Sequence, residues 1–241
     1  MQREDGRGAT ECRPTFLRKD VVSGGATGSA YGEFARTRVV VSVFGPRPKG
    51  KGDHQQQHGP GVDLHGMELD CQVHLPFEGR DAARSGKVGA STAREERERV
   101  LGRQLEQSIL PSIQQDRLPK TCLEIQCTIL ESDGNDIGAA IVCASFALAT
   151  SGIPLYDLVT SCTLACVGNQ LVVDPTQAEL DESEAEMSLA YMPSRGQVNF
   201  VHACGDWSEV SFKDHMDAGV NACKKAHALV KKSLVATVQT K

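Results

Sequence analysis

The chain has 241 residues, 40% of them hydrophobic, which predicts one or two globular domains with a sizeable core. No apolar run approaches the roughly 18 residues that cross a bilayer, and the polar N-terminus is unlike a signal peptide, so we expect a soluble intracellular protein. The formal net charge of −5 argues against a free-standing nucleic-acid binder, which normally carries a dominant basic face.

Lysine and arginine gather in four local groups. Each group is typical of a solvated face and also compatible with a binding patch, so any contact with nucleic acid is expected to be local or shared with other chains. The groups are Arg13, Arg18 and Lys19; Arg47, Lys49 and Lys51; Arg94, Arg97, Arg99 and Arg103; and Lys224, Lys225, Lys231 and Lys232.

The nine cysteines form no Cys-x-x-Cys pair, and several lie in apolar stretches. We interpret them as reduced thiols of the core. Cys162 and Cys166 resemble a metal or redox pair, but the segment TSCTLACV is typical of a strand, along which residues four apart stand about 13 Å from each other. Structural cysteines are therefore expected here instead of a metal site.

The N-terminal third predicts a tail, a hairpin and a loop. Residues 1–12 are charged and rich in glycine, which indicates a disordered tail ahead of one domain over residues 13–241. Residues 28–47 predict a β-hairpin with a buried second strand. Residues 49–61 predict a polar loop.

That loop contains His54 and His58, which on a helix would form a metal pair. Gly59, Pro60 and a run of glutamines argue against a helix there, so we do not expect a metal.

The middle of the chain alternates strands and helices. Residues 67–75 predict a half-buried strand, and residues 79–92 a flexible stretch. A helix follows and ends near Pro111, and residues 123–129 alternate as a clear strand. Residues 138–150 are apolar on all sides and predict a fully buried helix with a glycine stop at Gly152.

The C-terminal part predicts four short strands, over residues 160–167, 170–173, 187–192 and 197–203. A long amphipathic helix ends the chain, with Ser211 and Asp214 at capping-box spacing. Its apolar stripe comprises Phe212, Met216, Val220, Cys223, His227, Val230 and Leu234, where we interpret His227 as a packed residue. The whole predicts a mixed α/β (α+β) fold in which mixed sheets pack with a buried helix and a C-terminal amphipathic helix.

Generic catalytic motifs are missing: there is no phosphate-binding Gly-x-x-x-x-Gly-Lys-Ser/Thr loop, no Gly-x-Ser-x-Gly elbow and no His-Glu-x-x-His pair. One acidic run could hold a divalent metal or form a solvated turn, and we expect the turn. It comprises Glu179, Asp181, Glu182, Glu184 and Glu186.

Four segments in order resemble the RNase PH superfamily, and the resemblance extends from about Arg13 to Leu234. The segments are GSAYGEF at 28–34, FGPR at 44–47, ALATSGIPLYDLV at 147–159 and VVDPTQAELDESEAEMSLAYMP at 172–193.

Phosphorolytic members of that family carry a Gly-Ser/Thr-Arg-type turn before the buried helix, where an arginine and the helix N-terminus suit a phosphate dianion. Here the matching stretch is residues 133–138, in which Ile137 stands at the arginine position and Asp136 adds negative charge. The resemblance therefore implies a site that repels phosphate.

The family also has two aspartates six residues apart, implicated in acid/base or metal-assisted chemistry. Alignment on the Val-Val-Asp strand puts Leu180 and Glu186 at those positions, whereas a shift of one residue would place Asp181 at the first. No catalytic residue, cofactor or metal is therefore expected.

The family's RNA-contacting arginine pair corresponds to Glu96 and Arg97. Arg94, Arg97, Arg99 and Arg103 are consequently the candidate RNA-binding residues.

The resemblance implies a non-catalytic subunit of the six-membered ring of the eukaryotic RNA exosome, most similar to the ring-subunit family named for messenger-RNA transport. Expected partners are other RNase PH-like subunits, cap subunits with RNA-binding domains, and RNA, without a membrane. The expected locations are nucleus, nucleolus and cytoplasm. The alternative is an active phosphate-dependent 3′ exoribonuclease that uses Asp181 and Glu186.

Overall fold

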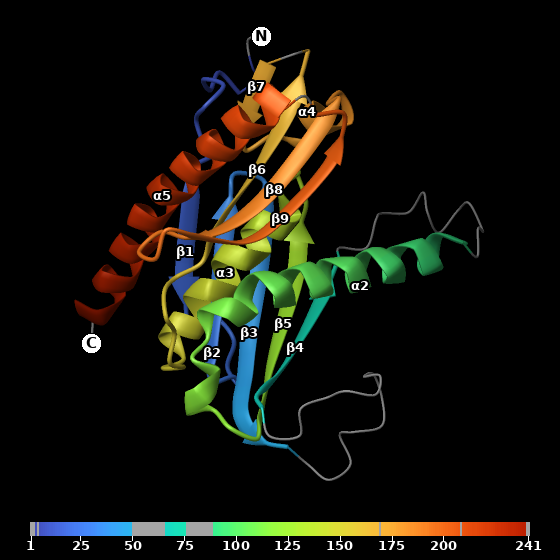
Figure 1. The fold of residues 1–241 in the computed structure, drawn as a ribbon. Helices are drawn as coiled ribbons and strands as arrows, with labels where there is room; N and C mark the ends of the chain where they lie inside the picture. The colour runs from blue at the N-terminus through green and yellow to red at the C-terminus, as the bar shows by residue number, and fades with distance from the viewer. Residues whose placement is uncertain are drawn as a thin grey trace.

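The computed structural model of the protein describes residues 3, 5–49, 66–75, 89–168, 170–207 and 209–239, which form two β-sheets with helices packed on them (Figure 1). In spatial order, the first sheet consists of β1 (Thr15–Lys19), β2 (Gly28–Phe34), β3 (Thr37–Pro48), β5 (Thr121–Glu131) and β4 (Glu68–His74). The second consists of β7 (Gln170–Val173), β6 (Thr160–Val167), β8 (Ala185–Met192) and β9 (Gln197–Gly205). The helices of the described residues are α2 (Gly89–Ile109), α3 (Asp136–Thr150), α4 (Gln177–Asp181) and α5 (Glu209–Gln239).

The first sheet is built on the predicted hairpin, which is confirmed. β2 pairs antiparallel with β3 through a tight connection between Phe34 and Thr37. Alternate residues of β3, Val39, Val41 and Val43, are fully buried because successive side chains of a strand point to opposite faces. β4 joins the other edge and runs parallel to β5.

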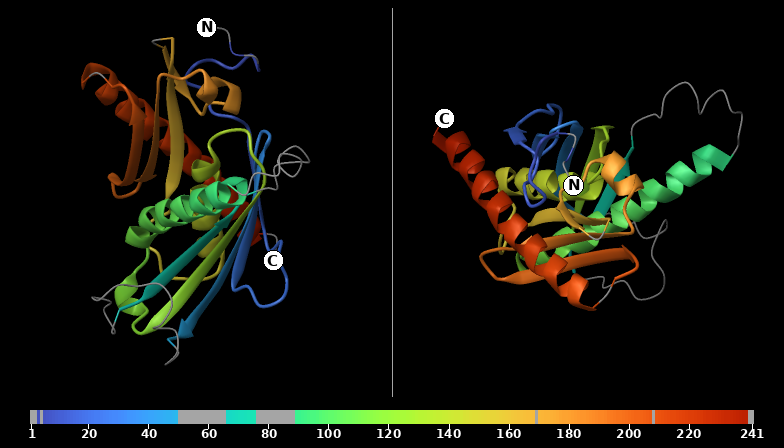
Figure 2. Two further views of the ribbon diagram at one scale, coloured as in Figure 1. Left: turned by 90° about the vertical axis from the view of Figure 1, so that its right-hand side faces the viewer. Right: turned by 90° about the horizontal axis from the view of Figure 1, so that it is seen from above.

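The predicted all-apolar helix is α3, which lies between the two sheets (Figure 2). It contacts β2 and β3 on one side and β6 and β8 on the other. One core cluster therefore joins residues of the first sheet to Ala190 and Met192 of β8. The mixed α/β arrangement expected from the sequence is confirmed.

α2 begins earlier than expected. The sequence predicts a flexible stretch over residues 79–92, but the helix starts at Gly89, and residues 76–88 lie outside the described part. Its end agrees with the prediction, because Pro111 sits in a short 3₁₀ turn directly after Ile109. His54 and His58 of the expected loop also lie outside the described residues.

α5 crosses the second sheet and continues toward β1 (Figures 1 and 2). Its stripe splits between two cores: Met216, Val220 and Cys223 pack with the second sheet, whereas Val230 packs with the first. The helix starts at Glu209, so the predicted cap at Ser211 is wrong. His227 is half-buried on the stripe, as a packed histidine would be.

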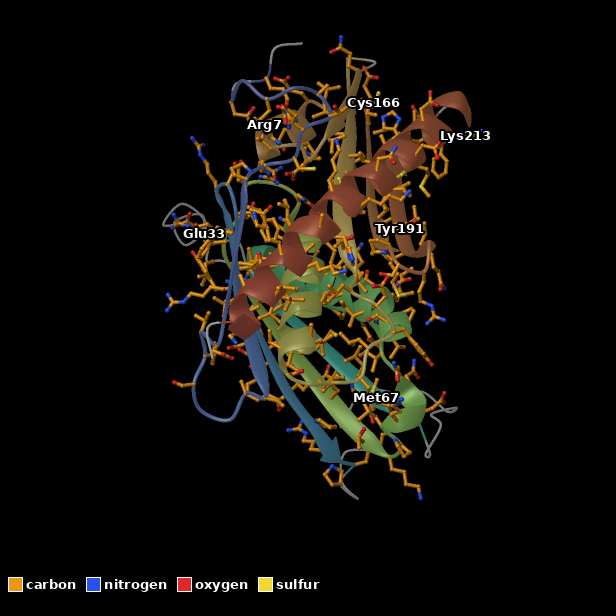
Figure 3. All side chains as sticks on the ribbon, turned by 90° about the vertical axis from the view of Figure 1, so that its left-hand side faces the viewer. Arg7, Glu33, Met67, Cys166, Tyr191 and Lys213 are labelled. Atoms are coloured by element: carbon orange, nitrogen blue, oxygen red, sulfur yellow. The ribbon has the colours of Figure 1, made fainter. Side chains whose placement is uncertain are left out.

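The described part of the expected disordered tail is held against the second sheet instead. Arg3 is 4% exposed and donates to both carboxylate oxygens of Glu179 at 2.7 Å. The Val173 amide donates to the Ala9 carbonyl at 2.8 Å. Figure 3 shows Arg7 at the same end of the molecule as Cys166 of β6. The composition of residues 1–12 predicts a disordered tail because it contains no information about their partners, Glu179 and Val173, which lie far away in sequence.

The cysteines are all free, but they do not all belong to the core. Cys12 and Cys204 are exposed, and Cys71 and Cys122 are half-buried, so the expectation of core thiols is wrong for them. Within the described residues, no helix combines the length and apolar character needed to cross a membrane.

Candidate functional site

The loop before α3 lies at the position where the sequence predicts a lost phosphate site. Its residues accept hydrogen bonds from other segments of the chain. Gly134 and Asn135 both have positive φ, at 77° and 55°, which turns the chain sharply into the helix. The Arg13 guanidinium donates to the carbonyls of Asp133 at 2.7 Å and Gly134 at 3.2 Å. The Thr163 hydroxyl donates to Asn135 Oδ1 at 2.6 Å. Hydrogen bonds from Arg13 and Thr163 therefore hold the loop in this conformation.

Asp136 places a buried carboxylate at the first turn of α3. Its two carboxylate oxygens each accept from Ser132 Oγ at 2.8 Å, and Arg97 Nη2 lies 3.5 Å from Oδ2. Burial raises the pKa of Asp136, although the Ser132 hydrogen bond and the charges of Arg97 and Arg13 oppose the rise. The positive end of the α3 dipole favours a negative charge, and here the Asp136 carboxylate provides it.

Ile137 points into the interior. It is 8% exposed and belongs to the core cluster that joins the two sheets. Residue 137 therefore contributes an apolar side chain, and not a cation, to the end of the loop.

The four candidate RNA-binding arginines do not form one patch. Arg94 donates to the Leu75 carbonyl at 2.7 Å and to Glu98 at 3.0 Å, which ties α2 to the end of β4. Arg97 reaches Asp136 while remaining 56% exposed. At 3.6 residues per turn, Arg99 and Arg103 lie on the opposite side of α2 from Arg94, and both are exposed. The structure therefore brings only Arg97 to the loop.

The predicted acidic run also separates in space. Glu179 is buried against Arg3 and forms a capping box with Thr176 at the start of α4. Asp181 is exposed and accepts from Gln177, whereas Glu186 lies half-buried on β8. Within the described ranges, no three His, Cys, Asp or Glu residues converge as a metal site. The Thr-x-x-Glu spacing of the capping box was readable in the sequence.

Leu180, at the first position matched to the family's aspartates, contacts a small apolar cluster on the second sheet. It packs against the buried residues Ala165, Val167 and Val172. This side chain supplies neither a proton nor a metal ligand.

Asp174 is the central polar residue that sequence reasoning missed. It is 5% exposed and has a φ of 52°. Its carboxylate accepts from the Arg13 amide at 2.7 Å, from the Arg13 guanidinium at 2.8 Å and from Asn135 Nδ2 at 2.9 Å. Burial alone would raise the pKa of Asp174, but the bonds and charge of Arg13 outweigh it and lower the pKa. Asp174 thereby links the N-terminal segment to the loop before α3.

Comparison with known proteins places this geometry in a family. The model of the 3′ exoribonuclease family, domain 1, matches residues 11–154, and that of domain 2 matches residues 157–222. An exosome complex component RRP41-like of Arabidopsis thaliana is 34% identical over 233 residues, covering 96% of this chain and 84% of the relative. An exosome complex component MTR3 of Mus musculus is 31% identical over 238 residues, covering 95% and 85%.

The fold agrees with a solved structure as well. Rice (Oryza sativa) Rrp46 superimposes with a TM-score of 0.77 at 20% identity, covering 96% of this chain and 99% of that one.

Proposed function

Because the chain belongs to the RNase PH family of 3′ exoribonucleases, we propose that it is a non-catalytic structural subunit of the RNA exosome ring. It supports 3′-to-5′ RNA processing and degradation by scaffolding the ring and by contacts along the RNA channel. Relatives named as exosome components over most of their length support this role.

The observation that carries the proposal is the Asp136 carboxylate at the N-terminus of α3, with Ile137 buried beside it. A phosphate dianion brought to this turn would meet a like charge in a buried setting, where such repulsion is poorly screened. Arg97, the only candidate arginine near the turn, is already paired with that carboxylate. Phosphorolysis needs phosphate bound next to the RNA end, so this subunit does not supply that step.

The proposed partners are other RNase PH-like subunits in a hetero-hexameric ring, cap subunits with RNA-binding domains, and RNA. Relatives of the RRP41-like and MTR3 types match at similar identity, and we propose the MTR3-type position because of the replaced turn at residues 133–138. The proposed locations are nucleus, nucleolus and cytoplasm.

We further propose that Arg94, Arg97, Arg99 and Arg103 provide positive charge for the RNA backbone. Arg99 and Arg103 lie on the exposed side of α2 and are suited to direct phosphate contacts, for which Arg99 would exchange its exposed ion pair with Glu96. Arg94 acts by positioning α2 through its bond to Leu75.

Two measurements test the proposal. The first is the subunit composition of the native complex purified with this chain, which we expect to contain other RNase PH-like subunits and cap subunits. Purification as a stable monomer free of those subunits would contradict ring membership.

The second measurement is phosphate-dependent release of nucleoside diphosphates from RNA by the chain alone and by the ring. We expect no release from the chain alone, and no change in the ring's activity upon Asp181→Asn or Glu186→Gln. Release that either substitution abolishes would establish instead the phosphorolytic enzyme that uses these two carboxylates.

A further inference from the structure

Cys12 and Cys162 line the same cavity although 150 residues separate them in sequence. Cys12 precedes β1 and is exposed, whereas Cys162 lies in β6 and is 3% exposed. Both side chains line one small cavity, together with Asn135, Asp174 and residues of α5. The cavity lies where the N-terminal segment passes the second sheet.

The two thiols share this cavity, and each changes the ionisation of the other. The neighbouring Cys162 thiol lowers the pKa of Cys12, whereas Cys12 and burial raise the pKa of Cys162, whose Sγ donates to the Thr163 carbonyl at 3.4 Å. Cys12 is exposed as a residue but faces the cavity, and the resulting desolvation of its thiol and the charge of Asp174 oppose the lowering, whereas Lys225 and Arg7 favour it. Cys12 is therefore the more acidic and the more accessible thiol of the pair, and these properties determine which thiol reacts first.

Asp174 holds the backbone next to each cysteine. The Arg13 amide, one residue after Cys12, donates to Asp174 Oδ2 at 2.7 Å. The Asp174 amide donates to the carbonyl of Thr163, one residue after Cys162, at 2.8 Å. Because both attachments go to the same buried residue, the two thiols are kept together in the folded protein.

We propose that Cys12 and Cys162 are a peroxide-responsive pair that forms an intramolecular disulfide. The Cys12 thiolate attacks hydrogen peroxide: an S–O bond forms, the O–O bond breaks, and the leaving hydroxide takes a proton to become water. Cys162 sulfur then attacks the Cys12 sulfenic acid: the S–S bond forms, the S–O bond breaks, and the hydroxide leaves with the Cys162 proton as a second water. The two sulfurs lose two electrons, and the peroxide gains them.

The disulfide ties the N-terminal segment covalently to β6. In the reduced protein this attachment depends on Arg3, Arg13 and the Ala9 backbone. Oxidation therefore converts a reversible contact into a fixed one. The inference is independent of the proposed function, because it rests on the thiols and not on phosphate or RNA.

The test is oxidation of the purified full-length chain with a few equivalents of hydrogen peroxide, followed by alkylation, digestion with trypsin and chymotrypsin, and mass spectrometry. Cleavage after Leu158 and Leu164 separates Cys162 from Cys166. We expect a peptide with Cys12 linked to Cys162, absent before oxidation and lost on treatment with dithiothreitol.

Cys204→Ser is the matched control, since Cys204 is the other exposed cysteine, and it should form the linked peptide as the wild type does. Cys12→Ser should form none and should leave Cys162 open to alkylation after unfolding. The proposal is overturned if oxidised wild-type protein carries Cys12 only as a sulfinic acid or in links between chains, with Cys162 still a thiol.

Discussion

Asp174 shows how one buried carboxylate positions several segments. It accepts hydrogen bonds from Arg13 and Asn135, and its own amide bonds to Thr163. The neighbouring buried pair of Arg3 and Glu179 attaches the same N-terminal segment to α4. These attachments are specific because each buried charge must have its partner.

We predict that Asp174→Asn lowers the free energy of unfolding at pH 7 by about 3 kcal/mol, because it leaves the Arg13 guanidinium buried without its counter-charge. Urea titration followed by circular dichroism measures this. Asp181→Asn removes an exposed carboxylate and should change stability by less than about 0.5 kcal/mol.

The pH dependence follows from the lowered pKa of Asp174. Its ordinary value is 3.8, so its contribution to stability is present above pH 3.8 and is lost as the pH falls through its lower folded value. The stability difference between wild type and Asp174→Asn should consequently shrink below pH 4. A difference that stays constant down to pH 2 would contradict this.

Asp136→Asn should strengthen RNA binding by the assembled ring about fivefold, because Arg97 is released for an RNA phosphate, worth roughly 1 kcal/mol. Fluorescence anisotropy with single-stranded RNA at fixed salt measures the change. Adding Arg97→Gln to the variant should abolish the gain. An equal gain in the double variant would show that Arg97 is not the residue released.

The same substitution should not weaken the fold at neutral pH. Because burial raises the pKa of Asp136, ionising this side chain above that pKa lowers the free energy of unfolding. Asparagine is neutral and does not have this destabilising effect.

At the scale of elements, α2 rests on β4 through a glycine. A Cβ added at Gly102 would lie 2.6 Å from the Cys71 carbonyl oxygen, which is backbone and cannot move aside alone. The helix therefore approaches the strand as closely as it does because this residue has no side chain.

Gly102→Ala should lower the free energy of unfolding by about 1 to 2 kcal/mol, even though alanine favours a helix by about 1 kcal/mol, because overpacking against β4 outweighs the propensity. Gln107→Ala, on the exposed side of the same helix, should be neutral within about 0.5 kcal/mol. Urea titration compares the two. Stabilisation by Gly102→Ala would mean that α2 and β4 separate readily.

At the scale of the whole molecule, α3 and α5 connect the two sheets. α3 contacts both sheets, and Val230 of α5 joins the core cluster that also contains Val41 and Ala190. The two family models meet between residues 154 and 157. We propose that residues 13–241 nevertheless form one cooperative domain, because neither sheet has a complete core alone.

This proposal predicts one unfolding transition. Trp207 is the only tryptophan and packs with the core of the second sheet, so its fluorescence reports that sheet. Far-UV circular dichroism reports the whole chain. The two curves should coincide in urea with one midpoint. An earlier Trp207 transition would indicate two separate domains.

Features predicted correctly from the sequence depend on neighbours in the chain. The β2–β3 hairpin, the all-apolar α3 and the end of α2 at Pro111 follow from local periodicity, glycine and proline. The capping box at Thr176 is equally local, but the acidic residues around Glu179 favour a solvated turn in the sequence and hide it.

Local patterns in the sequence predict the fold class and the resemblance to the RNase PH family, and that resemblance aligns Ile137 with an arginine of the phosphorolytic members. Tertiary packing is needed to see that Arg3 and Arg13 anchor the N-terminal segment, that Arg97 pairs with Asp136, and that Cys12 and Cys162 line one cavity. The two kinds of feature differ in the sequence separation between the groups that interact. Periodicity and turn chemistry act within a few residues, whereas these pairs join atoms that come together only after the two sheets pack around α3.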